Sequence, residues 1–136
     1  MSRTSLAFIG LLAVSSCSPG ADLPAADRTI AAFHTALNAG QFGQIYATSS
    51  TAMKAATKQE KLTSLLAAVH RKLGNFKSGS RTGWNDSVTT NGHYVTISYA
   101  AKYARGDAVE NFVLAIADGK PSLAGYNINS DALILN

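Results

Sequence analysis

A histidine and several tyrosines are the side chains in this sequence best suited to proton transfer. His34 follows Ile30 and Phe33 in a segment whose apolar residues recur every three or four positions, which places it on the apolar face of a helix. Tyr99 and Tyr103 share one face of an alternating segment, so the imidazole and the two phenols could converge as general acid and base. A buried structural histidine beside core tyrosines has the same pattern, and we favour that interpretation and assign no catalytic residue. The candidate pocket residues are Phe33, His34, Tyr46, Tyr99, Tyr103 and Phe112.

Glu110 and the other two histidines are weaker candidates for chemistry. Glu110 shares strand parity with Phe112 and would lie near the pocket rim if that face is inward, but its place one step from a predicted hairpin favours the surface. His70 and His93 stand near charged or turn positions and are also expected at the surface. The histidines are far apart and lack the spacing of metal ligands, so we expect no metal site and no cofactor.

The one cysteine of the chain has a different context. Arg3 precedes an uncharged apolar block at 6–14, which is typical of a secretory signal and far shorter than the ~20 residues that span a membrane. Small residues then lead to Cys17, and Val14-Ser15-Ser16-Cys17 resembles a bacterial lipobox, in which the sulfur carries a diacylglyceryl group. A lone cysteine cannot form an internal disulfide, which favours lipidation over an incidental thiol.

These signals divide the chain into three parts. Residues 1–16 are the expected signal peptide, 17–26 the lipidated cysteine and a short linker, and 27–136 a single domain large enough to bury one core. Anchoring by two or three acyl chains is stable, so we expect an exported protein at the cell envelope. In a Gram-negative organism, Ser18 after the cysteine favours the periplasmic face of the outer membrane.

The charge balance does not point to nucleic acid. The chain has 12 Lys and Arg against 8 Asp and Glu, a mildly basic composition. Its basic residues gather between positions 54 and 81, where a solvated helix face is the preferred interpretation. The expected partners are therefore the membrane, through Cys17, and a small apolar ligand or an envelope protein, with no nucleic acid.

Helical patterns occupy the first half of the domain. One helix is expected from Asp27, as its cap, to Gly40, and a short helical segment over 42–46. Thr57 to Glu60 form a capping-box pattern that predicts a second long helix ending at Gly74. The predicted core stripe of that helix is Leu62, Leu65, Leu66, Val69 and Leu73.

The period changes from 3.6 to 2 after this helix. Turns are expected at Gly106-Asp107 and Asp118-Gly119, and 85–92 is expected to be a polar connection. Four strands in a meander with helices on one face define an α+β fold. The predicted strands are 75–84, 95–103, 109–117 and 123–129.

Several strings of the domain resemble those of a known group. "ALNAGQFGQIYATSS" and "DGKPSLAGYNINSDALI" look like exported bacterial domains of the nuclear-transport-factor-two-like, or cystatin-like, superfamily, and the chain is similar to domain-of-unknown-function family 4019. The likeness covers about residues 27–134. It implies N-terminal helices packed on a curved antiparallel sheet, shaped as a cone with a pocket, and it carries over no catalytic residue.

Three functions remain open on these grounds. The preferred hypothesis is a non-catalytic, membrane-tethered envelope lipoprotein that binds a small apolar ligand or a partner protein. The alternatives are a small cone-fold enzyme, of isomerase or dehydratase type, that uses His34 and pocket tyrosines, and a structural envelope protein that self-associates through Val109, Val113 and Ala115 on one sheet face.

The lipobox interpretation predicts that Cys17→Ser abolishes membrane fractionation and leaves the fold unchanged, because the tether lies outside the core. Membrane fractionation and intact mass of the purified protein measure both effects. Retained acylation in this variant would contradict the lipobox assignment.

Overall fold

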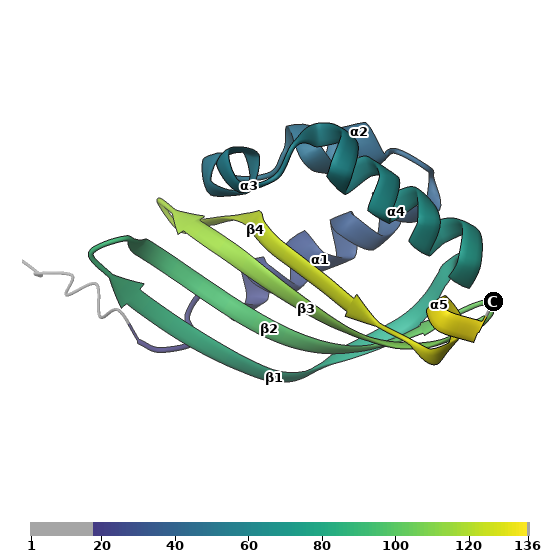
Figure 1. Cartoon of the computed structure of the whole chain (residues 1–136). Helices are drawn as coiled ribbons and strands as arrows, with labels where there is room; N and C mark the ends of the chain where they lie inside the picture. The colour runs from purple at the N-terminus through teal and green to yellow at the C-terminus, as the bar shows by residue number, and fades with distance from the viewer. Residues whose placement is uncertain (1–17, 136) are drawn as a thin grey trace, which may run out of the picture.

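Four helices at the start of the domain cover one face of a four-stranded antiparallel sheet in the computed structural model, which describes residues 18–135 (Figure 1). The α+β class and the N-terminal helical layer are as predicted. The predicted signal peptide and Cys17 lie outside the described residues. The helices are α1 (Leu23–Asn38), α2 (Phe42–Ala47), α3 (Thr51–Ala56), α4 (Gln59–Leu73) and α5 (Asp131–Leu135), and the strands are β1 (Phe76–Thr89), β2 (Gly92–Tyr103), β3 (Gly106–Ala117) and β4 (Lys120–Asn129).

None of the helices within residues 18–135 is long and apolar enough to cross a membrane.

The first helix starts earlier than the sequence pattern predicts. Its N-cap is Asp22 and not Asp27, and Pro24 lies in its first turn. Proline is accommodated there because the N–H groups of a first turn have no partner within the helix. The helix ends as expected before Gly40, whose φ of +70° suits a residue without a side chain.

The second long helix ends before Gly74 as predicted, but it does not begin with the predicted capping box. Thr57 is the C-cap of α3, in extended conformation, so α4 begins at Gln59 behind Lys58 and the capping box does not form. Leu65 is 41% exposed and does not belong to the buried stripe, whose members follow a strict alternation of four and three residues. The buried residues of α4 are Leu62, Leu66, Val69 and Leu73.

The strands follow the predicted meander in the order β1-β2-β3-β4, with two turns displaced. Residues 85–89 continue β1, because they pair with β2 across the hairpin despite their polar side chains. The β2–β3 turn lies at 104–105 and not at Gly106-Asp107, since the N–H of Arg105 bonds to the carbonyl of Leu73 and fixes the turn against the end of α4. Asp118 and Gly119 form the last turn as predicted, both with positive φ.

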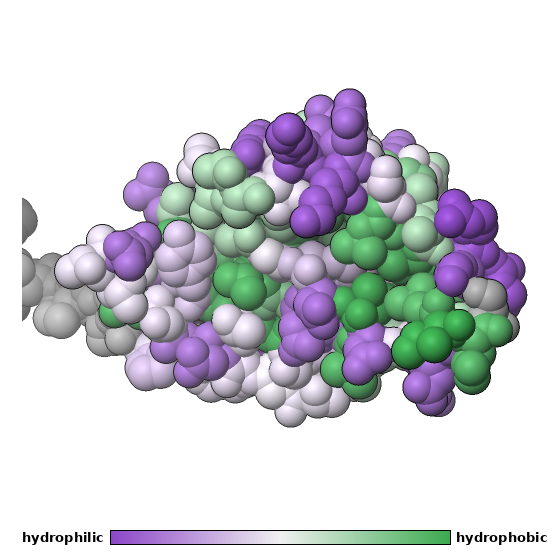
Figure 2. Space-filling model, viewed as in Figure 1, coloured by the Kyte–Doolittle hydropathy of each residue, from purple (hydrophilic) through white to green (hydrophobic). Residues whose placement is uncertain are grey.

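The core lies between the inner sheet face and the helices. On β2 the buried residues alternate as expected, with Val95, Ile97, Ala101 and Tyr103 inward. The outer sheet face is solvated, and Val109 on it is half-exposed. In the view of Figure 2, hydrophilic side chains gather over the helical layer, which fits a solvated outer face on α4.

Leu66→Ala is expected to lower the free energy of unfolding by about 2 to 5 kcal/mol, because Leu66 is fully buried and its truncation leaves a cavity. Urea denaturation measures the loss. Leu65→Ala, on the same helix, is the matched control and is expected to lose much less; equal losses would show that the buried face of α4 is misassigned.

Candidate functional site

A buried carboxylate stands at the centre of the most polar part of the core. Glu110 on β3 is 0% exposed. Its Oε1 accepts hydrogen bonds from the hydroxyls of Tyr103 at 2.5 Å and Tyr126 at 2.7 Å, and its Oε2 lies 2.8 Å from Nε2 of His34. We call these four residues the Glu110 cluster. They come from α1, β2, β3 and β4, so the cluster joins the first helix to three strands.

The sheet register explains how the tyrosines reach Glu110. Between Tyr103 and Glu110 on the inner face lies only the pair Ala101 and Ala108, whose small side chains leave room for the phenol to extend along the sheet. Tyr126 pairs with Phe112, the next inward residue of β3, and reaches Glu110 diagonally.

His34 is held by rings. Its imidazole stacks on Phe76 with centroids 3.7 Å apart and planes 6° from parallel, and Tyr99 and Phe112 lie against its other sides. Nε2 carries the proton when it donates to an ionised Glu110. Nδ1 is buried and has no hydrogen-bond partner among the described residues.

The electrostatics keep the phenols protonated. Burial raises the pKa of Tyr103 and of Tyr126 far above the usual value for tyrosine, and the negative charge of Glu110 raises the pKa of both further. Burial and then Glu110 also raise the pKa of Tyr99. The tyrosine hydroxyls of the cluster therefore act as hydrogen-bond donors to Glu110 and not as acids.

A groove of about 600 Å³ lies between α1, α2 and the β3–β4 end of the sheet. We call it the α1–α2 groove. Its apolar lining is Ile30, Phe33, Ile45, Phe112, Leu114 and Leu123, with further alanine and proline carbons. Its polar lining is neutral and consists of Thr29, Thr35, Gln41, Gln44, Thr48 and Ser122.

Two phenylalanines separate the groove from the Glu110 cluster. Phe33 and Phe112 both line the groove, and their ring centroids lie 5.5 Å and 5.9 Å from that of His34. Since none of the four cluster residues lines the groove, the cluster does not open into it. A molecule in the groove would contact the phenylalanine rings and not the imidazole.

The structure brings together most of the residues that the sequence singles out. Phe33, His34, Tyr99, Tyr103 and Phe112 pack against one another, with the first and last also lining the groove. Tyr46 lies apart on α2, where its hydroxyl donates to the carbonyl of Thr57 at 3.0 Å.

Two members of the cluster escape sequence reasoning. The prediction that Glu110 lies at the surface is wrong, because the true turn at 104–105 leaves Glu110 well inside β3, with its side chain inward. Tyr126 is missed because a β-bulge in β4 breaks the two-residue alternation along that strand. The bulge lies opposite Val113 and Leu114 of β3. The shared parity of Glu110 with Phe112 was the signal that could have placed the carboxylate.

One group of side chains that could ligate a metal lies away from the groove. Asp22, Asp86 and His93 approach one another where the chain enters α1. His93, expected at the surface, is partly exposed there, with 26% of its side chain accessible.

The comparison with protein families identifies the domain. A family model described as "Protein of unknown function (DUF4019)" matches residues 29–126. The chain belongs to the DUF4019 family. No curated protein matches the chain. The match contains the whole Glu110 cluster of this DUF4019 domain, from His34 to Tyr126. The wider resemblance to the nuclear-transport-factor-two-like superfamily remains a prediction.

The raised tyrosine pKa values predict a loss of stability in alkali. Above pH ~10 the phenols of the unfolded chain ionise, whereas Tyr103 and Tyr126 keep their protons in the folded state. Their contribution is complete below the unfolded pKa and is lost as the pH rises toward the folded pKa. Urea unfolding from about pH 8 to 11 is expected to show this fall in the free energy of unfolding.

The double variant Tyr103→Phe/Tyr126→Phe should show a shallower fall over the same range. Tyr94→Phe, which removes a hydroxyl outside the cluster, is the control and should follow the wild type. Parallel curves for the double variant and the wild type would contradict the assignment.

Proposed function

We propose that this DUF4019 domain is a non-catalytic binding module that holds a small apolar ligand in the α1–α2 groove and is tethered to the cell envelope by lipid on Cys17. The observation that carries the proposal is the groove itself. Its volume of about 600 Å³ lies within the range of small-molecule sites.

The lining of the groove defines the ligand class. Aliphatic and aromatic side chains of α1, α2 and β3 form its walls, and its polar groups are neutral amides and hydroxyls. None of the residues that line it carries a formal charge. The lining therefore favours an uncharged ligand with a hydrocarbon body and one or two groups that can hydrogen-bond.

The arrangement of the acid–base groups supports binding over catalysis. His34, Tyr103 and Tyr126 are already hydrogen-bonded to Glu110, which is itself fully buried. A general acid or base must come within hydrogen-bond reach of the reacting group. An isomerase or dehydratase that uses these residues would need Phe33 and Phe112 to move apart first.

The tether follows from the sequence pattern that ends at Cys17. Only a short polar stretch separates this residue from α1, so the domain would stand close to the membrane surface. On this proposal the protein is exported and anchored at the periplasmic face of the outer membrane in a Gram-negative organism. The alternative occupant of the α1–α2 groove is a partner protein of the envelope.

Self-association through the outer sheet face has weaker support. Val109 is 51% exposed there, but the surrounding hollow of about 640 Å³ also presents Ser78, Lys102, Asp107 and Asn129. These polar and charged side chains interrupt the apolar surface around Val109, whereas a stable contact between copies is favoured by a continuous apolar patch.

Ala36→Trp should narrow the α1–α2 groove, because Ala36 is half-buried in its lining. We expect the affinity for a probe such as 1-decanol to fall about tenfold or more, equivalent to about 1.4 kcal/mol. Titration calorimetry measures the affinity, and circular dichroism checks the fold.

Ala31→Trp is the matched control, since Ala31 lies exposed on the same helix and outside the lining. It should bind the probe as the wild type does. Undiminished binding by Ala36→Trp would place the ligand elsewhere, and no binding by the wild type would count against an apolar ligand.

A further inference from the structure

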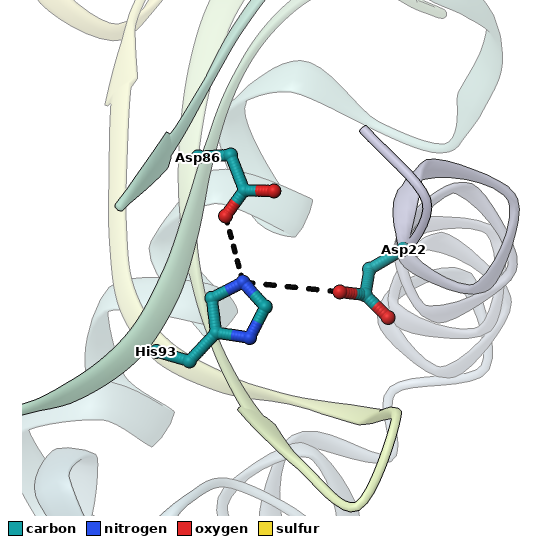
Figure 3. Close-up of side chains that lie close together, drawn as sticks. All are labelled: Asp22, Asp86 and His93. Carbon is teal, nitrogen blue, oxygen red and sulfur yellow. Dashed lines mark hydrogen bonds and ion pairs between the residues drawn. The ribbon is translucent and has the colours of Figure 1, made fainter. Parts of the chain in front are cut away.

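A histidine and two aspartates meet at the end of the sheet where the chain enters the domain (Figure 3). Nε2 of His93 lies 2.7 Å from Oδ1 of Asp86 and 3.8 Å from Oδ2 of Asp22. One ligand atom from each residue lies within 4.8 Å of the others. We propose that Asp22, Asp86 and His93 form a site for a divalent transition metal, with Zn²⁺ as the ion that fits best.

The two sheet residues are placed by the β1–β2 hairpin. Asp86 pairs with Val95 and His93 pairs with Val88, so the two side chains are diagonal neighbours on one face. Val95 on that face is buried, which shows that the face is the inner one. The hairpin alone therefore supplies an imidazole nitrogen and a carboxylate oxygen side by side.

Asp22 completes the group from a different part of the chain. It is the N-cap residue of α1, a position where aspartate usually accepts a hydrogen bond from the first turn. Here its side chain makes no such bond, and its carboxylate approaches His93 instead. The helix thus forgoes a stabilising cap, and the carboxylate contributes a third ligand atom to the group.

A further contact holds the carboxylate of Asp86 in place. The backbone N–H of Gly20 donates to its Oδ2 at 3.3 Å, which leaves Oδ1 directed at His93. Hydrogen bonds to the second oxygen of a ligating carboxylate are typical around metal ions, because they fix the orientation of the ligand.

The distances and the charge fit a tetrahedral ion. Ligands about 2.0 to 2.1 Å from Zn²⁺ in tetrahedral geometry stand about 3.4 Å apart. The separations of 2.7 Å and 3.8 Å at His93 bracket this value, and carboxylate oxygens of the two aspartates lie within 4.8 Å of each other, so small side-chain shifts would admit the ion. Two carboxylates also balance a divalent charge when His93 is neutral.

The imidazole ligand makes Ca²⁺ and Mg²⁺ a poorer fit to this site than a transition metal. Ca²⁺ and Mg²⁺ prefer oxygen ligands alone, whereas imidazole nitrogen favours Zn²⁺ and its neighbours among the transition metals. Three protein ligands leave a fourth position for solvent or for a group from outside the domain.

A metal here would act on the junction between tether and domain. Asp22 and Gly20 belong to the segment that leads from Cys17 into α1, while Asp86 and His93 belong to the sheet. The bound ion would clamp this segment to the β1–β2 hairpin and so fix how the domain stands relative to its anchor point. This inference does not depend on the α1–α2 groove.

Calorimetric titration of the purified, tag-free full chain with ZnCl₂ tests the site, with MgCl₂ as the comparison. One Zn²⁺ per chain should bind, and Mg²⁺ should bind far more weakly. His93→Gln should weaken Zn²⁺ binding at least about 100-fold, because loss of even an outer partner of a ligand costs about 10- to 100-fold. Zinc should also slow amide hydrogen exchange at 20–23 in the wild type.

His70→Gln is the matched control, because His70 bonds to Asn75 at another place in the fold. It should bind Zn²⁺ as the wild type does, and both proteins retain Cys17. Asp22→Asn provides a second test that does not depend on the hairpin, since asparagine is also a good N-cap. Wild-type affinity in His93→Gln or Asp22→Asn, or no zinc binding by the wild type, would overturn the proposal.

Discussion

The burial of the Glu110 charge is the constraint on which the rest of this fold depends. An ion in a closed apolar core costs several kcal/mol unless donors surround it. Glu110 has three, and each arrives on a different element: His34 on α1, Tyr103 on β2 and Tyr126 on β4. The position of α1 along the sheet and its rotation about its own axis are therefore both fixed, because a shift in either would leave a buried charge without a partner. Apolar packing alone is more tolerant of such shifts.

The same constraint keeps the Glu110 cluster apart from the α1–α2 groove. Residues with the capacity for proton transfer are occupied by one another, and the rings of Phe33 and Phe112 stand between them and the α1–α2 groove. The groove can then vary in its neutral lining without disturbing the charged centre. The region matched to the DUF4019 family contains both the Glu110 cluster and the lining of the groove.

The sequence predicts the elements of this protein better than its polar contacts. Helical stripes and strand alternation are properties of neighbouring residues, so the long helices, the meander and the inward set of β2 can be recognised directly. The Glu110 cluster cannot, because a turn displaced by two residues moves Glu110 from a hairpin to mid-strand and a bulge hides Tyr126. Likewise, Asp86 meets His93 only because β1 continues through polar residues that resemble a loop. These features depend on pairing between segments, which periodicity does not report.

The meander also sets an order for folding. Each strand pairs with the next one along the chain, so the sheet can form through short loops whose closure costs little entropy. The bond from His34 to Glu110 spans 76 residues. The imidazole of His34 therefore has no carboxylate partner until the third strand exists, whereas Asp27 and Asn38 of the same helix can already bond to Arg81 and Phe76 of β1.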